Sequence, residues 1–173
     1  SYHGSTNGAM TASGDPRKLP VDSQQAPNFV HFDLPIEYRW DYGKEAFLKE
    51  AVESLERMVA YEGPGNIAAI MLEGESGSSG CLKYPEGYLK AVRKICDDNG
   101  LLLIMDDVMT GFGRTGKWFG FQNNGIVPDM IAMAKGLTCG YLHFGCLQVS
   151  DRIASKYDDT VLALGLTYAA HPV

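Results

Sequence analysis

The sequence predicts an α/β protein with three layers and a mostly parallel sheet. Short apolar runs typical of buried strands, such as residues 67–72 and 101–105, alternate with segments whose apolar residues recur at helical spacing. Apolar residues make up 45% of the chain and charged residues 21%, as in soluble globular domains. We expect residues 1–173 to form a single domain, with a loop-rich segment at 1–42 and an alternating helix and strand core at 43–173.

The elements follow in order from the amino terminus. Residues 1–42 hold four of the eight prolines and are expected to be irregular, apart from a short strand at 29–32. A helix is predicted from residue 43 to Glu62, ended by Gly63-Pro64-Gly65. The apolar positions of this helix recur every three or four residues: Phe47, Ala51, Leu55, Met58 and Val59.

A buried strand at 67–72 leads into a Gly/Ser-rich loop, and a second helix is predicted from Pro85 to the residue before Gly100. Its apolar face consists of Tyr88, Leu89, Val92, Ile95 and Cys96. Further strands are expected at 101–105, 130–133 and 144–149, and a short helix through residue 156, capped by Ser150 or Asp151.

Composition excludes several classes of function. The net charge of −6 and the lack of a basic run argue against nucleic acid as the main partner. The longest apolar runs are far too short to span a bilayer, so no membrane association is expected. The four cysteines are widely spaced without a CxxC pair, which favours reduced thiols and a cytoplasmic setting and gives no expectation of a metal site.

Chemistry-bearing residues follow the predicted strands. Glu73, Asp106 and Lys135 stand just after apolar runs, and ligands of parallel sheets bind at the carboxyl ends of strands. A carboxylate and a lysine at one sheet edge suit pyridoxal phosphate, which needs an amine for its Schiff base and an acid beside its ring nitrogen. Taken singly, Asp106 could equally be a turn former and Lys135 a solvated side chain.

The glycines of Gly111–Gly116 offer an alternative. They spell GxGxxG, and Asp129 lies 18 residues after the first of them, so a dinucleotide-binding domain is a competing hypothesis. The context is poor, because the glycines of such a site follow a strand directly and open a helix.

Several motifs together resemble the class III aminotransferase family. LIMDDVMTGFGRTG at 103–116 is similar to its LI-x-DEV-x-TGFGRTG block, and the PDM and AKGL stretches at 128–137 are similar to its lysine motif. Tyr2-His3-Gly4 matches its YHG, Glu73 the acid of its EP-x-x-G, and LTYAAHPV at 166–173 resembles HTYSGHPV. The matches occur in the family's order over nearly the whole chain.

The resemblance implies the aspartate-aminotransferase-like fold, called fold type I, with pyridoxal 5′-phosphate and a homodimer. It implies that Lys135 holds the cofactor and transfers a proton, and that Asp106 keeps the pyridine nitrogen protonated. Tyr2 would stack on one face of the ring with His3 beside it, and Val108 would press on the other face. Thr167 would bind the phosphate of the neighbouring subunit's cofactor, and Glu73 would belong to the same site.

The sequence also departs from the family pattern. Asp107 replaces a Glu, Gly74 replaces a Pro, and Ser78 stands where ornithine- and GABA-type members carry a gating glutamate. Family members are more than twice as long, so the chain is expected to be part of a large domain that lacks the upstream phosphate-binding turn and the small domain. The expected reaction is transamination between an amino donor and pyruvate or 2-oxoglutarate; the alternative is a non-catalytic, self-associating remnant of such an enzyme.

Overall fold

The structure, a computed structural model, describes residues 1–35, 43–165, 167 and 172, with the backbone but not the side chains of residues 21–23. One sheet in the described part of the chain has the strand order β1-β2-β3-β4. Its strands are β1 (Ala69–Glu73), β2 (Leu102–Asp106), β3 (Met130–Met133) and β4 (Cys146–Val149). The first three are parallel and β4 runs antiparallel to β3, so the predicted α/β class with a mostly parallel sheet is confirmed.

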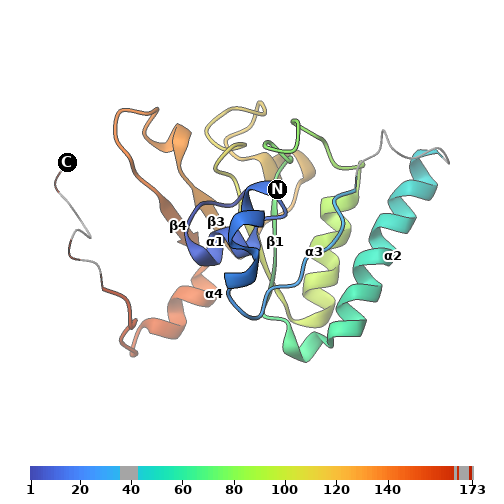
Figure 1. Cartoon of the computed structure of the whole chain (residues 1–173), viewed down its shortest axis with the longest axis horizontal. Coiled ribbons are helices and arrows are strands. Elements are labelled where there is room, and N and C mark those ends of the chain that lie inside the picture. The colour runs from blue at the N-terminus through green and yellow to red at the C-terminus, as the bar shows by residue number, and fades with distance from the viewer. Residues whose placement is uncertain (36–42, 166, 168–171, 173) are drawn as a thin grey trace.

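Two amphipathic helices lie together beside the sheet. α2 (Lys44–Glu62) and α3 (Tyr88–Asn99) lie side by side, and α3 packs against β2 (Figure 1). All five residues predicted for the apolar face of α3 are buried. Gly100 ends α3 with a left-handed backbone (φ 70°), a conformation that residues with a Cβ disfavour, and its N–H donates to the carbonyls of Asp97 and Cys96. Both helices end at the predicted glycines.

The core lies between these helices and the sheet. It combines residues of α2, β1, α3, β2 and β3 with two side chains from the connection after β2; its largest members include Leu55, Tyr88, Leu89, Leu103, Met105 and Phe121. In β1 and β2 every second side chain points into this core, and those side chains are apolar, as expected for strands that bury one face. A short helix, α4 (Asp151–Ala154), follows β4 with Ser150 at its amino end. No helix in the described ranges is long and apolar enough to cross a membrane.

The amino-terminal segment corrects two expectations. Residues 29–32 form no strand, because none of their backbone groups pairs with a strand edge, and Phe29 and Val30 are about half exposed. The segment is also less irregular than expected, since it contains α1 (Asn7–Ala12) and a 3₁₀ helix at Pro16–Gln24. α1 carries no apolar periodicity; tertiary contacts bury Thr11, whose hydroxyl accepts from the Ala26 N–H at 2.9 Å.

Candidate active site

Three predicted site residues gather at one edge of the sheet. Glu73 ends β1 and Asp106 ends β2, and the parallel register places them directly opposite one another. Both are buried, with 2% and 4% of their surface exposed. Lys135 follows β3 by two residues, and β3 pairs with β2 at Asp106. Parallel pairing therefore brings two acids and an amine to the same carboxyl-end edge, where α/β proteins bind ligands.

Asp106 is held by a histidine from the start of the chain. His3 Nδ1 lies 2.8 Å from Asp106 Oδ2, with only 6% of either side chain exposed. The other carboxylate oxygen accepts the backbone N–H of Val108 at 3.0 Å. With Asp106 ionised, His3 must donate through Nδ1. The pair orients the carboxylate and leaves part of its acceptor capacity free.

Glu73 is fixed by the loop that follows it. Its Oε2 accepts the Gly77 N–H at 2.9 Å, and its Oε1 lies 3.5 Å from the Ser76 hydroxyl. A phenol that sequence reasoning missed stands near both acids: burial, and then the charges of Glu73, Tyr88 and Asp106, raise the pKa of Tyr84 far above its ordinary value. Tyr84 is therefore neutral, and its ring packs against that of Tyr88, with the centroids 5.5 Å apart. No motif pointed to it, because only the fold brings it to this edge.

Asp107 points into the protein instead of the site. It is fully buried, and its Oδ1 accepts from the Thr110 hydroxyl and from the Gly120 N–H. Its Oδ2 has no partner among the described residues. Burial raises the pKa of this carboxyl, against the lowering effect of its hydrogen bonds. Asp107 thus organises the connection after β2, while its neighbour Asp106 faces His3.

The remaining predicted residues have varied settings. Lys135 is exposed and has a left-handed backbone (φ 42°), unusual for a residue with a side chain. Val108 is half-buried beside Asp106. The Tyr2 ring carries the Arg17 guanidinium 4.0 Å from its centroid. The predicted ring contacts of Tyr2 and Val108 stay predictions.

The carboxy-terminal motif is only partly described. Leu166, 168–171 and Val173 lie outside the described residues, and Thr167 is exposed. Its predicted role concerns a second subunit and likewise stays a prediction.

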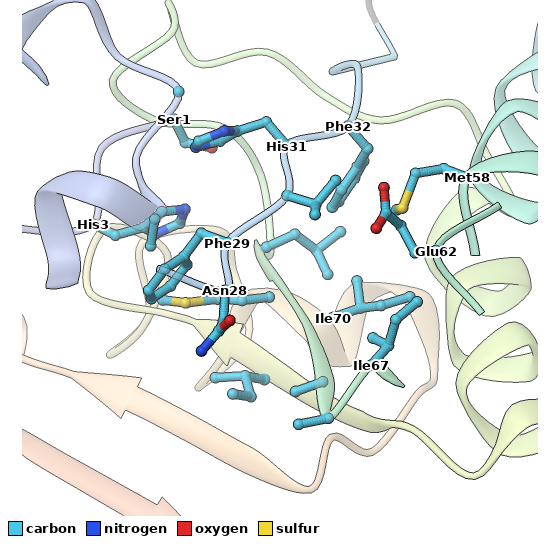
Figure 2. A pocket seen from close by; sticks show the side chains of 18 of the residues that line it. Ser1, His3, Asn28, Phe29, His31, Phe32, Met58, Glu62, Ile67 and Ile70 are labelled. Carbon is cyan, nitrogen blue, oxygen red and sulfur yellow. The ribbon is translucent and has the colours of Figure 1, made fainter. Parts of the chain in front are cut away.

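An enclosed, partly apolar cavity lies beside this edge, along β1. It encloses about 640 Å³ between β1, the carboxyl end of α2 and residues 28–34. Figure 2 shows His3 and His31 on one side, and Phe32, Ile67, Ile70 and Met58 around its apolar part. Of the predicted site residues only His3 lines it. The reactive groups lie at the strand ends, so the candidate site is there, and His3 belongs both to it and to the lining of the cavity.

The glycine-rich segment does not fit a dinucleotide site. Gly111 donates its N–H to the Asp107 carbonyl at 2.8 Å, and residues 108–119 form turns and bends. A pyrophosphate site of that type needs a helix amino terminus at the glycines, and none opens there. The dinucleotide alternative is therefore wrong for Gly111–Gly116.

Comparison with known proteins assigns the family. The model of the class-III aminotransferase family matches residues 1–173, the whole chain. The chain belongs to the class-III aminotransferase family.

Curated and solved class-III aminotransferases resemble the chain throughout. A probable aminotransferase of Mycobacterium tuberculosis is 37% identical over 99% of this chain and 38% of its own length. Hypotaurine/taurine–pyruvate aminotransferase of Paracoccus denitrificans is 35% identical over 91% of this chain and 34% of its own length. Taurine:2-oxoglutarate aminotransferase of Bifidobacterium kashiwanohense, solved with PLP and glutamate, superposes with a TM-score of 0.95 at 45% identity, over 99% of this chain and 40% of that one. The chain thus spans little more than a third of the length of these relatives, and the aspartate-aminotransferase-like fold is confirmed for that part.

Proposed function

We propose that this chain carries the cofactor-binding part of a pyridoxal-phosphate-dependent aminotransferase, which moves an amino group between an amino donor and a 2-oxo acid. The observation that carries the proposal is the His3–Asp106 pair, 2.8 Å apart and buried, at the sheet edge where Lys135 is exposed. On this proposal residues 1–173 are one part of a large domain, with a loop-rich segment at 1–42 and an alternating helix and strand core at 43–173.

The residues at the edge fit the cofactor. A carboxylate has about four acceptor positions, and Asp106 uses one oxygen for His3 and the other for the Val108 N–H. Capacity remains for the N–H of a pyridinium ring. Lys135 offers an exposed primary amine at the same edge. A buried acid with a spare acceptor and an accessible amine are the two groups that this cofactor requires.

Each residue then has a distinct task. Bound pyridoxal phosphate supplies a carbonyl carbon to which amines add, and a ring that takes up the electron pair released at the substrate α-carbon. Lys135 Nζ would hold the cofactor through its carbonyl carbon. When the donor takes its place, the free amine would accept the proton of the substrate α-carbon and return it to the neighbouring cofactor carbon. Asp106 keeps a proton on the ring nitrogen, and His3 prevents the carboxylate from turning away. Tyr2 and Val108 enclose the ring, and Glu73 and Tyr84 lie beside it at the end of β1.

The comparisons favour a small ω-amino donor. The names of the taurine aminotransferases among the relatives give pyruvate or 2-oxoglutarate as the amino acceptor. We infer a taurine-like donor and one of these two acceptors for this chain. Ser78, in place of a gating glutamate, supports this choice over ornithine and GABA. We further propose a homodimer, with Thr167 contributing to the partner's phosphate site.

Covalent trapping tests the proposal. The purified chain is incubated with pyridoxal phosphate, reduced with borohydride and digested, and the cofactor adduct is mapped by mass spectrometry. We expect a single stoichiometric adduct at Lys135, absent from Lys135→Ala and unchanged in Lys83→Ala, a surface control. Labelling spread over surface lysines, or none at Lys135, would refute the proposed function.

A further inference from the structure

Two non-glycine residues in the connections beside the candidate active site have left-handed backbones. Lys135 has φ 42° and Phe112 has φ 59°. Such conformations are costly for residues with side chains and persist only where the surroundings enforce them. The two residues belong to different connections, one following β3 and the other following β2.

Phe112 packs directly against the residue after the lysine. A Cβ placed on Gly136 would lie 2.9 Å from Phe112 Cβ and 3.1 Å from a ring carbon. Real Cβ atoms do not approach each other so closely, so the phenylalanine occupies the space that any side chain at 136 would need. The glycine is required here by contact, and the contact restricts the peptide that joins it to Lys135.

The phenylalanine is itself anchored to the core. Its N–H donates to the Trp118 carbonyl at 2.6 Å, and its ring meets the Phe119 ring edge-on, with centroids 5.7 Å apart. Phe119 in turn stacks on Phe121, which is buried in the core with 7% of its surface exposed. A row of three aromatic rings therefore connects the core to the lysine turn.

We propose that Phe112 is a positioning residue that holds the left-handed backbone of Lys135 by filling the space against Gly136. The φ and ψ angles of Lys135 set the direction in which its Cα–Cβ bond leaves the turn, and hence where Nζ can reach. Without Phe112 the turn can relax to a commoner conformation and carry the amine away from Asp106. This inference rests on the proposed function only where it concerns cofactor capture; the backbone conformation is a separate claim.

The test uses four variants and two controls. Phe112→Gly removes the ring and the Cβ of residue 112, and glycine tolerates the positive φ. Gly136→Ala adds a methyl group that clashes with Phe112. The double variant has the methyl group at 136 but no Phe112 side chain for it to clash with. Phe112→Leu keeps Cβ and an apolar side chain as the conservative variant. Phe47→Ala removes a buried ring far from the turn, and Gly65→Ala adds a methyl where nothing lies within 4 Å.

Two measurements separate positioning from stability. The Cα chemical shift of Lys135 in the labelled chain reports its backbone without cofactor, and borohydride trapping reports its capture of pyridoxal phosphate. We expect Phe112→Gly and Gly136→Ala each to move the shift and to lower adduct yield by about tenfold, because small misplacements of reacting groups are costly. The adduct yield of the double variant should fall by less than the product of the two single-variant losses. Phe112→Leu and both controls should keep the wild-type Cα shift of Lys135.

An unchanged Lys135 shift in Phe112→Gly and Gly136→Ala would overturn the positioning role, whatever the adduct yield. Losses that simply multiply in the double variant would also overturn it, since the residues would then act independently. If the wild-type chain itself gives no adduct at Lys135, the proposed function fails, while the shift comparison still decides the role of Phe112.

Discussion

His3 Nδ1 lies 2.8 Å from Oδ2 of Asp106, across 103 positions of sequence. The pair joins the first residues of the chain to the end of β2 and lies almost entirely out of solvent. A buried carboxylate is costly unless it is hydrogen-bonded, and the histidine, with the Val108 N–H, meets that need. Both residues therefore serve to present one oriented acid at the sheet edge.

Replacing Asp106 should lower the rate of transamination more than replacing His3. In the complete enzyme we expect Asp106→Asn to lower kcat about a hundredfold to a thousandfold, because the charge that stabilises the ring proton is lost. His3→Phe retains the acid but not its orientation, and should cost about tenfold, as outer positioning partners do. Amino transfer to pyruvate gives the rates, and His143→Phe, at an exposed position, is the control. An Asp106→Asn enzyme as fast as the wild type would contradict the assignment.

Asp107 should make folding stability fall as pH rises. Burial raises the folded-state pKa of this carboxyl above its ordinary value of 3.8, so the folded chain binds the proton more tightly than the unfolded chain. Below the pKa that Asp107 has in the unfolded chain, the carboxyl is protonated in both states and its titration does not change the free energy of unfolding. As pH rises from that value to the higher pKa of the folded chain, the free energy of unfolding falls. Asp107→Asn removes this titration.

Urea unfolding between about pH 3 and pH 7 measures the effect. The free energy of unfolding of Asp107→Asn, relative to wild type, should increase with pH across this range. Asp158→Asn, at an exposed position, should show no such trend. A constant difference between Asp107→Asn and wild type would disprove the shift.

Asp129 should stabilise the fold through ion pairs at the opposite end of the strands. Its two oxygens lie 2.8 Å from Arg93 of α3 and from Arg152 of α4, and one also accepts the Leu103 N–H. We expect Asp129→Ala to cost about 3 kcal/mol, because it leaves a largely buried arginine without this partner. Asp97→Ala removes the exposed partner of the same arginine and should cost about 1 kcal/mol or less.

The pH dependence of Asp129 has the opposite sign to that of Asp107. Burial pulls its pKa upward, but the hydrogen bonds from the Leu103 N–H and from Arg93 outweigh burial and lower the pKa below 3.8. The stabilisation is present above the unfolded pKa and is lost as pH falls through the folded pKa. The advantage of wild type over Asp129→Asn in urea unfolding should therefore shrink below about pH 4. An advantage that grows on acidification would contradict the ion-pair account.

The elements that the sequence predicted well depend on local pattern. The apolar face of α3 follows from spacing alone, and Gly63 and Gly100 end their helices because of their own backbone freedom. Strand positions were right to within about two residues, the usual uncertainty of element ends. The segment at 29–32 failed because an apolar run becomes a strand only when a neighbouring edge supplies hydrogen bonds.

The sequence by itself determined the alternation of strands and helices, and with it the edge where Glu73, Asp106 and Lys135 would meet. Its motifs also pointed to the family that the comparisons show. Only the tertiary structure decided that His3 pairs with Asp106, that Tyr84 stands near both acids, and that Phe112 requires a glycine at 136. Periodicity encodes which face of an element is buried, whereas contacts between distant segments depend on how complete elements pack in three dimensions.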